Sequence, residues 1–315
     1  MAVRTNTSIL GVPLGLGAGR IGADAGDRAL RMERLHDQLL AMGVDVEDCK
    51  SLTIPSATNP GNPNARFLAE ISDTCNKIAE WMQEKLQENR MPMVLGGDHS
   101  IGAGTVSGTA AFYHQRQERI GVIWIDAHAD MNTPETSPSG NVHGMPLAAL
   151  LGHGPDSLTK LRGFHPKISP RNTVLVGIRD IDEGEVKLIR ELGVRAFTTR
   201  DIDERGMFSV MHEAIEWATF GTAGFHLSFD MDALDPTIAP GVGTPVPGGL
   251  TYREAHLALE MIADCGHMVS MDVVEVNPML DAQNLTARVA VGLISSALGK
   301  SILPRFNKPL AKTPV

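Results

Sequence analysis

Cysteine is scarce in this sequence, with only three residues of this type among 315. Cys49, Cys75 and Cys265 lie far apart and none stands in a C-x-x-C spacing, which excludes a disulfide framework and a thiolate zinc site. So sparse and odd a set favours a reducing compartment, and we expect the protein to be cytoplasmic. Long apolar runs are missing too, because no stretch suits a signal peptide or approaches the ~20 apolar residues of a membrane helix. We therefore expect no membrane partner.

Clustered positive charge is also lacking, since the net charge is −9 and Lys and Arg are scattered along the chain. Nucleic acid is not an expected partner, because a phosphate backbone needs a clustered basic face. A mildly acidic protein favours small cationic substrates in its long-range field. Hydrophobic residues make up 43% of the chain and charged residues 21%, as in a folded globular protein. We expect a single domain over residues 1–315, because folded pattern resumes on both sides of each Pro/Gly-rich stretch.

Short apolar segments that end in glycine or aspartate alternate with longer segments of helical periodicity. This alternation is typical of βαβ units and a parallel sheet. We predict an α/β fold, a three-layer α/β/α sandwich with a mostly parallel, doubly wound sheet. The expected strands are Ser8–Val12, Met91–Leu95, Arg119–Asp126, Asn172–Gly177, Gly224–Asp230 and His267–Val276. The expected helices are Phe67–Gln87, Glu183–Leu192, Ser209–Ala218, Thr251–Asp264 and Leu285–Leu298.

Polar side chains follow three of the predicted strands, at the sheet edge where ligands bind in open parallel sheets. His99 follows a Gly-Gly pair at the end of one strand. The next strand ends in a D-x-H-x-D motif, whose alternate residues project to the same side if the extended geometry persists. A third strand ends in a second alternating set of carboxylates, whose repulsion bound cations would relieve. The candidate metal ligands are His99, Asp126, His128, Asp130, Asp230 and Asp232.

These six candidates offer imidazoles and carboxylates but no thiolate, a set that suits hard or borderline divalent ions. We expect two Mn²⁺ ions, which can share a water and lower its pKa from about 15.7 towards ~7. Each motif alone has an ordinary alternative. A D-x-H-x-D can be a solvated loop, and a histidine after a strand often only satisfies hydrogen bonds. Three motifs at three strand ends favour the metal site over these alternatives.

Several other polar residues allow both a structural and a functional interpretation. His143 can satisfy backbone groups or, with an ordinary pKa near ~6.5, carry protons beside a metal-bound hydroxide. Asp180, Asp182 and Glu185 can be carboxylates that stabilise a helix N-terminus, or ligands of a substrate. Glu275 near a strand end beside the proposed metals requires a cationic partner, and a guanidinium would be that partner.

Two loops remain open at this level. The segment 132–144 is rich in amide and hydroxyl groups, which suits turn formation or, given its place after Asp130, a substrate loop. The glycines of Gly11–Arg20 superficially suggest a dinucleotide-binding fingerprint. No G-x-G-x-x-G opens a helix there, so this interpretation is disfavoured.

Four segments resemble the signature blocks of the ureohydrolase family of arginases and agmatinases: Gly96–Ser100, Asp126–Asp130, Ser228–Pro236 and Glu275–Pro278. The resemblance covers nearly the whole chain, although Asp27 stands where a proline is usual. It implies a homo-oligomer, a trimer or hexamer, and two Mn²⁺ bridged by two aspartates. One ion would be held by His99, Asp126, Asp130 and Asp230, and the other by Asp126, His128, Asp230 and Asp232.

The segment Ser137–Gly144 is similar to the arginase form of the family's substrate loop, which differs in agmatinases. The resemblance implies hydrolysis of the cationic substrate L-arginine to L-ornithine and urea by a metal-bridging hydroxide. Asp130 would align the hydroxide and pass on its proton, and His143 would relay protons. The alternatives are an agmatinase or guanidinobutyrase with the same metals, and a non-catalytic binding protein. The resemblance also implies the substrate contacts. Those of the α-carboxylate are Asn132, Ser137 and Ser139, with Asn141 of the same loop. The α-amino group would be bound directly by Asp182, and through water by Asp180 and Glu185. The guanidinium would be bound by Glu275 and Thr244.

Overall fold

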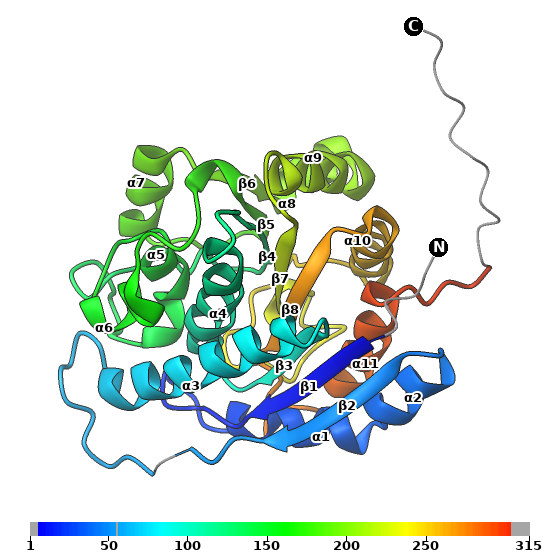
Figure 1. Ribbon diagram of the computed structural model, residues 1–315, viewed down its shortest axis with the longest axis horizontal. Coiled ribbons are helices and arrows are strands. Elements are labelled where there is room, and N and C mark those ends of the chain that lie inside the picture. The colour runs from blue at the N-terminus through cyan, green and yellow to red at the C-terminus, as the bar shows by residue number, and fades with distance from the viewer. Residues whose placement is uncertain (1–5, 55, 304–315) are drawn as a thin grey trace, which may run out of the picture.

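The computed structural model describes residues 6–54 and 56–303, and every strand in them belongs to one sheet. Neighbouring strands are parallel throughout, in the order β2-β1-β3-β8-β7-β4-β5-β6 (Figure 1). The fully parallel sheet confirms the predicted fold class. The strands are β1 (Asn6–Val12), β2 (Asp45–Ser51), β3 (Met91–Gly96), β4 (Gly121–Ile125), β5 (Thr173–Ile178), β6 (Arg195–Thr198), β7 (Phe225–Asp230) and β8 (Met268–Val274).

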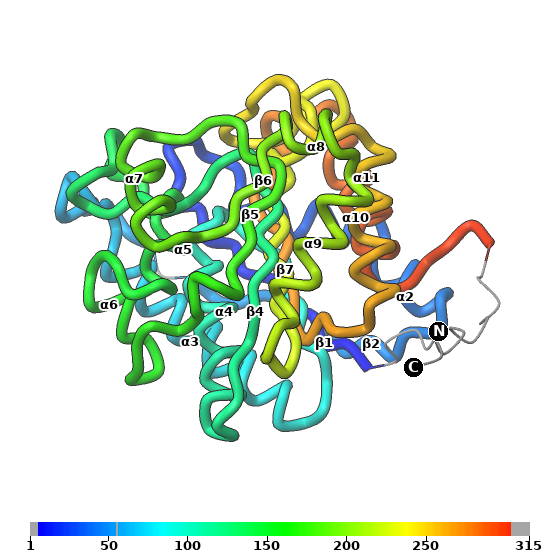
Figure 2. Tube along the Cα trace, turned by 90° about the horizontal axis from the view of Figure 1, so that it is seen from above, coloured from blue at the N-terminus to red at the C-terminus, as the bar shows by residue number. Residues whose placement is uncertain are grey.

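Helices cover both faces of this sheet, which gives three layers (Figure 2). Alternate residues of each central strand pack into different cores; Ile123 faces one and Trp124 the other. Both faces are buried, which explains why β3 and β4 have nearly continuous apolar sequences. One face is covered by α1 (Gly26–Met32), α2 (Leu35–Ala41), α8 (Thr199–Arg205), α9 (Met207–Thr219), α10 (Tyr252–Cys265) and α11 (Leu285–Ala297). The other face is covered by α3 (Leu68–Gln87), α4 (Gly102–His114), α5 (Pro146–Leu150), α6 (Asp156–Thr159) and α7 (Glu183–Leu192).

Sequence pattern missed the two edge strands and the central helix α4. β2 has the polar sequence DVEDCKS and is largely exposed, because an edge strand has no need of an apolar run. α4 is buried on nearly all sides and so has no amphipathic period. Its Gly104 and Gly108 lie against the backbone of α3, where an added Cβ would come within 2.7 Å and 2.5 Å of backbone oxygens.

The four central strands β3, β8, β7 and β4 bring the candidate residues to one edge of the sheet. β3 and β4 are consecutive in the chain but separated in the sheet by β8 and β7, so the chain reverses its direction of winding here. Ligands of open α/β sheets bind at such a switch point, beyond the carboxyl ends of the strands. No helix in the described residues is long and apolar enough to cross a membrane.

Candidate metal centre and substrate site

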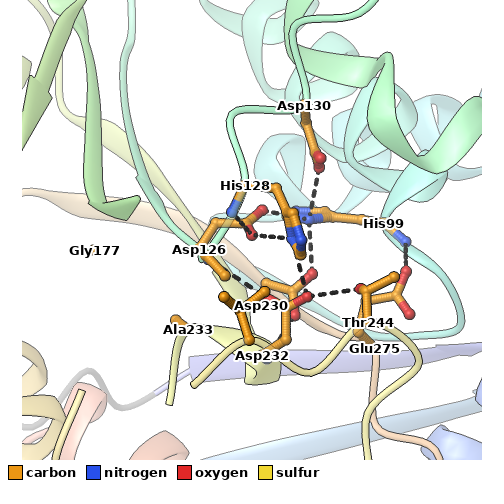
Figure 3. A network of polar contacts seen from close by, with 12 residues as sticks. His99, Asp126, His128, Asp130, Gly177, Asp230, Asp232, Ala233, Thr244 and Glu275 are labelled. Atoms are coloured by element: carbon orange, nitrogen blue, oxygen red, sulfur yellow. Dashed lines mark hydrogen bonds and ion pairs between the residues drawn. The ribbon is translucent and has the colours of Figure 1, made fainter. Parts of the chain in front are cut away.

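His99 enters the site directly after β3, held by contacts on several sides (Figure 3). The preceding turn needs Gly97, because a Cβ there would lie 2.3 Å from the carbonyl oxygen of Leu14. The backbone N–H of His99 donates to Glu275 Oε1 at 2.8 Å, and its ring stacks on Trp124 at 4.2 Å between centroids. The ring's Nδ1 therefore points at the carboxylates, 2.9 Å from Asp130 Oδ2.

The D-x-H-x-D motif folds into a turn, and the expected continuation of the extended strand was wrong. β4 ends at Ile125, and Asp126 Oδ1 accepts the backbone N–H of His128 at 2.7 Å, as in an Asx turn. Asp130 has a left-handed backbone with φ 53°, which is uncommon outside glycine. Its side chain nevertheless lies beside His99. The side chains of the motif therefore come together because the backbone bends, and not because alternate residues of a strand share one face.

Asp230 and Asp232 also converge by a turn, since Asp230 Oδ1 accepts the backbone N–H of Asp232 at 2.7 Å. Asp232 Oδ2 lies 3.1 Å from His128 Nδ1 and accepts a hydrogen bond from the hydroxyl of Thr244 at 2.9 Å. Asp235, three residues further on, instead accepts the backbone N–H groups of Gly248 and Gly249 at 2.8 Å and 3.2 Å.

Two groups of side chains in the described residues have the geometry to hold a cation: His99, Asp126 and Asp230, and Asp126, His128 and Asp232. Within each group the ligand atoms lie within 4.8 Å of one another, and Asp126 belongs to both. His99 Nδ1 and Asp130 Oδ2 are buried but make no hydrogen bond of normal geometry, although they are 2.9 Å apart. Such an arrangement is typical of groups whose lone pairs are directed at a shared cation. The all-N,O donor set fits hard or borderline divalent ions.

Within this cluster, protons on some side chains compensate the charge of others. Burial lowers the pKa of His99, but the charge of Asp130 outweighs it and raises that pKa well above its usual range. Burial raises the pKa of Asp126, but hydrogen bonds with His128 and His99 hold it below its usual range. Burial, followed by the charge of Asp126, raises the pKa of Asp130 to about 6. Burial and Asp232 likewise raise the pKa of Asp230 well above its usual range. The cluster therefore retains protons that divalent cations would displace, as expected of a metal site.

Glu275 contacts both His99, a candidate metal ligand, and His143. Its Oε1 accepts the N–H of His99 and lies 3.0 Å from His143 Nδ1, while its Oε2 is buried with no hydrogen-bond partner. β8 ends at Val274, short of the predicted end at Val276, and Glu275 has a left-handed φ of 63°. Among the described residues Oε2 is thus an acceptor without a partner, which is costly unless a cation binds there.

His143 lies beside Glu275, in the middle of the short 3-10 helix Val142–Gly144, with its side chain 16% exposed. Burial lowers the pKa of His143, but the hydrogen bond and charge of Glu275 outweigh this and raise it to about 9. The backbone N–H of His143 donates to Gly17 O at 3.2 Å, and Asp98 accepts the N–H of Gly17 at 2.8 Å. The glycine-rich segment thus supports the His143 loop instead of forming a dinucleotide site.

The outer end of the site joins segments far apart in the chain. Asn132 Nδ2 donates to Asp182 Oδ2 at 2.8 Å, next to a surface hollow that Asp182 lines with Thr136 and Pro138. Ser137 and Ser139 form the hydrogen bonds that we expected if the segment 132–144 only forms turns. Their hydroxyl oxygens accept the N–H groups of Gly140 and Asn141 at 3.0 Å and 3.2 Å.

The three candidate substrate carboxylates near the start of α7 differ in their surroundings. Asp180 and Asp182 are exposed, whereas Glu185 is buried. Glu185 accepts the backbone N–H groups of Met131 and Asp182, each at 2.9 Å, and burial raises its pKa to about 7. It ties the helix start to the segment after Asp130, so it holds the outer end of the site in place.

Two arginines that we did not predict hold the loops of the site. Arg179, directly after β5, donates to the carbonyl oxygens of Asp232 at 2.7 Å and of Val246 at 2.7 Å, together with those of Gly177, Ala233 and Leu234. Its position at the carboxyl end of a strand could have indicated that Arg179 belongs to the site. Arg66 donates to Asn141 Oδ1 from a segment 75 residues away, and no sequence pattern indicated it.

Comparison with known proteins gives consistent matches over nearly the full chain. The arginase family model matches residues 5–299. Arginase from Bacillus caldovelox is 48% identical over 299 residues, covering 94% of this chain and 99% of that protein. Its native crystal structure superposes with a TM-score of 0.91 and covers 95% of this chain and 100% of that one, at 47% identity. Entamoeba histolytica arginase, solved in complex with L-ornithine, has a TM-score of 0.87 at 34% identity and covers 95% and 100%.

Proposed function

The chain belongs to the arginase family, and we propose that it hydrolyses L-arginine to L-ornithine and urea at a binuclear manganese site. Membership makes it a ureohydrolase, and relatives named arginase support arginine as the substrate. The observation that carries the proposal is the buried, unpaired Glu275 Oε2 beside two His/Asp groups that fit metal ions. It offers a place for a guanidinium cation next to the source of a nucleophile. The three cysteines are free thiols, which supports a reducing cytoplasm as the proposed location.

The metal ligands we propose are those that the family resemblance implied. Two Mn²⁺ ions would supply hydroxide at neutral pH, because a water shared by two divalent ions has its pKa lowered from about 15.7 towards ~7. His99, Asp126, Asp130 and Asp230 would hold one ion, and Asp126, His128, Asp230 and Asp232 the other.

The chain's own residues then orient the substrate and move its protons. Glu275 Oε2 holds the planar guanidinium, whose charge persists at any working pH. Addition of hydroxide to the guanidinium carbon is followed by cleavage of its bond to the δ-nitrogen. Asp130 accepts the proton of the added hydroxide and gives it to that nitrogen, so the amine leaves as ornithine and the rest as urea. His143, which is partly exposed, exchanges protons with solvent.

The outer end of the site suits an amino acid head group. Asp182 provides a carboxylate for the α-amino group, and Asn132, Ser137, Ser139 and Asn141 provide hydrogen bonds for the α-carboxylate. The contact between Asn132 and Asp182 supports this role, since it brings the two halves of the clamp together. The L-ornithine complex of the Entamoeba histolytica neighbour also supports an amino acid product. Asp180 and Glu185 would reach the α-amino group through water, and Thr244 would assist Glu275.

The test is urea release from arginine, agmatine and 4-guanidinobutyrate after chelated protein has been reconstituted with Mn²⁺. Arginine is expected to be preferred, because a site built to hydrogen-bond a group can reject analogues that lack it by ~10⁴–10⁵. Preference for agmatine or guanidinobutyrate would show that the amino acid clamp is misassigned. Full turnover by protein shown by elemental analysis to be metal-free would refute the mechanism.

A further inference from the structure

A stripe of polar side chains runs through the dry interior beneath the metal cluster. His226 and Ser228 lie on β7, and Ser270 and Asp272 lie on β8; all four are 0% exposed. Strand register places Ser228 beside Asp272 and His226 beside Ser270. These residues share the sheet face covered by α4, whose Thr105 and Thr109 contact them. A buried carboxylate there is costly unless its bonds are satisfied.

In the hydrogen bond between Ser228 and His99, only one assignment of donor and acceptor agrees with the other contacts of the stripe. Ser228 Oγ lies 2.8 Å from His99 Nε2 and 2.6 Å from Asp272 Oδ1. The ionised carboxylate of Asp272 can only accept, so the single hydroxyl proton of Ser228 is donated to it. The oxygen of Ser228 must then accept its second bond from a proton on His99 Nε2. A neutral His99 therefore has its free lone pair on Nδ1, which faces Asp126, Asp130 and Asp230.

Asp272 is itself fixed from the other side. Its Oδ2 lies 2.9 Å from His226 Nε2 and accepts the hydroxyl of Thr105 on α4. The ring of His226 is held in turn by Ser270 Oγ at 2.7 Å from Nδ1. The acceptor that orients Ser228 is therefore anchored by two elements and has little freedom to rotate.

We propose that Asp272, acting through Ser228, is a positioning group that sets the tautomer and orientation of His99 for one of the two cations. The proposal rests on the proposed metal site and extends it to residues that make no contact with the ions. Outer partners of this kind typically change metal affinity by about 10–100-fold. The effect falls on one ion only, because His128, the imidazole of the other group, lies on a separate turn and is 24% exposed.

The test compares two buried serines of the same stripe. Ser228→Ala removes the link to His99, whereas the matched control Ser270→Ala removes a hydroxyl that contacts His226 and Thr109 but neither His99 nor Asp272. Mn²⁺ binding to chelated protein is measured by titration calorimetry, with metal stoichiometry by elemental analysis. We expect one site of Ser228→Ala to weaken by about 10–100-fold and the other to remain unchanged. Ser270→Ala should bind both ions as the wild type does, and Ser228→Thr should restore the weakened site.

Thermal unfolding of the metal-free variants controls for folding. Should Ser228→Ala fail to fold, Ser228→Cys keeps the size of the side chain but offers a weaker donor, and should show the same selective loss. Unchanged affinity at both sites, or equal losses in the Ser228 and Ser270 variants, would overturn the proposal. A wild type that binds fewer than two Mn²⁺ ions would instead count against the proposed function, so the two failures are distinguishable.

Discussion

Glu275→Gln removes a negative charge from the site while keeping the size and shape of the side chain. Glu275 is 1% exposed, and its Oε2 has no partner within the described chain. A guanidinium bound there forms a buried ion pair, and removing one partner of such a pair costs about 3–5 kcal/mol. At ~1.4 kcal/mol per tenfold change, kcat/KM should fall by roughly 10²–10⁴. The loss should be similar for arginine and agmatine, because both carry the guanidinium.

The assay is urea release under kcat/KM conditions, with the metal content of each preparation measured in parallel. Metal content matters because Glu275 Oε1 also accepts the backbone N–H of His99. The reasoning is refuted if Glu275→Gln retains both metals and loses less than about tenfold in kcat/KM. It is equally refuted if arginine turnover falls while agmatine turnover does not, since the charge would then serve the amino acid head.

Three further predictions address proton transfer, substrate selection and acid stability. His143→Asn should lower kcat by roughly 10²–10⁴ with both metals still bound; an unchanged kcat across pH would leave His143 a structural role only. Asp182→Asn, which keeps a good helix N-cap, should reduce kcat/KM for arginine by about tenfold with little effect on agmatine, since exposed charged hydrogen bonds lie near ~1.5 kcal/mol; equal losses on both substrates would contradict the clamp. Hydrogen bonds from Thr237, with further ones from Gly248 and Gly249, lower the pKa of Asp235 to about 2. Because the folded pKa lies below the ordinary ~3.9, this stabilisation is complete above about pH 4 and is lost as the pH falls towards ~2. The difference in Tm between metal-free wild type and Asp235→Asn should therefore shrink in that range, and a constant difference would refute the assignment.

The strands that precede the candidate metal ligands were predictable because they are buried on both faces. Apolar runs such as MVL before His99 and VIWI before Asp126 can be recognised without any partner, and their ends place the candidate ligands at one sheet edge. The edge strand β2 could not be found in this way, since its exposed faces accept polar residues. Helix α4 was missed because it is buried all round, which removes the amphipathic period on which helix prediction relies.

The backbone conformations of the site were beyond sequence pattern. Asp130 and Glu275 have left-handed backbones at non-glycine positions, each worth about 1–3 kcal/mol of strain. Extrapolating the strands would aim both side chains elsewhere, which is why the expected alternation failed. Contacts with other segments hold both conformations. The carbonyl oxygen of Asp130 accepts the N–H of Leu147 at 3.0 Å, and the N–H of Glu275 donates to the carbonyl oxygen of Gly97 at 2.9 Å.

The polar stripe of β7 and β8 was visible in the sequence but was not interpreted. His226 and Ser228 alternate with apolar residues in FHLSFD, and Ser270 and Asp272 do so in MVSMDVV. A polar residue at every second position of a central strand is unusual when both faces are dry. Two adjacent strands with this pattern indicate a buried network, and its proximity to Asp230 relates it to the metal site.

Every side of His99 has a partner from a different part of the chain. Its backbone N–H donates to Glu275, its ring face stacks on Trp124, and its Nε2 is bonded to Ser228. Only Nδ1 remains for a cation. The local Gly-Gly-Asp-His-Ser motif supplies the imidazole, but its direction depends on β4, β7 and the segment after β8. A chain with the same Gly-Gly-Asp-His-Ser motif but apolar residues at positions 228 and 272 would retain the same candidate metal ligands. It would nevertheless lose the hydrogen bond that restrains the ring of His99.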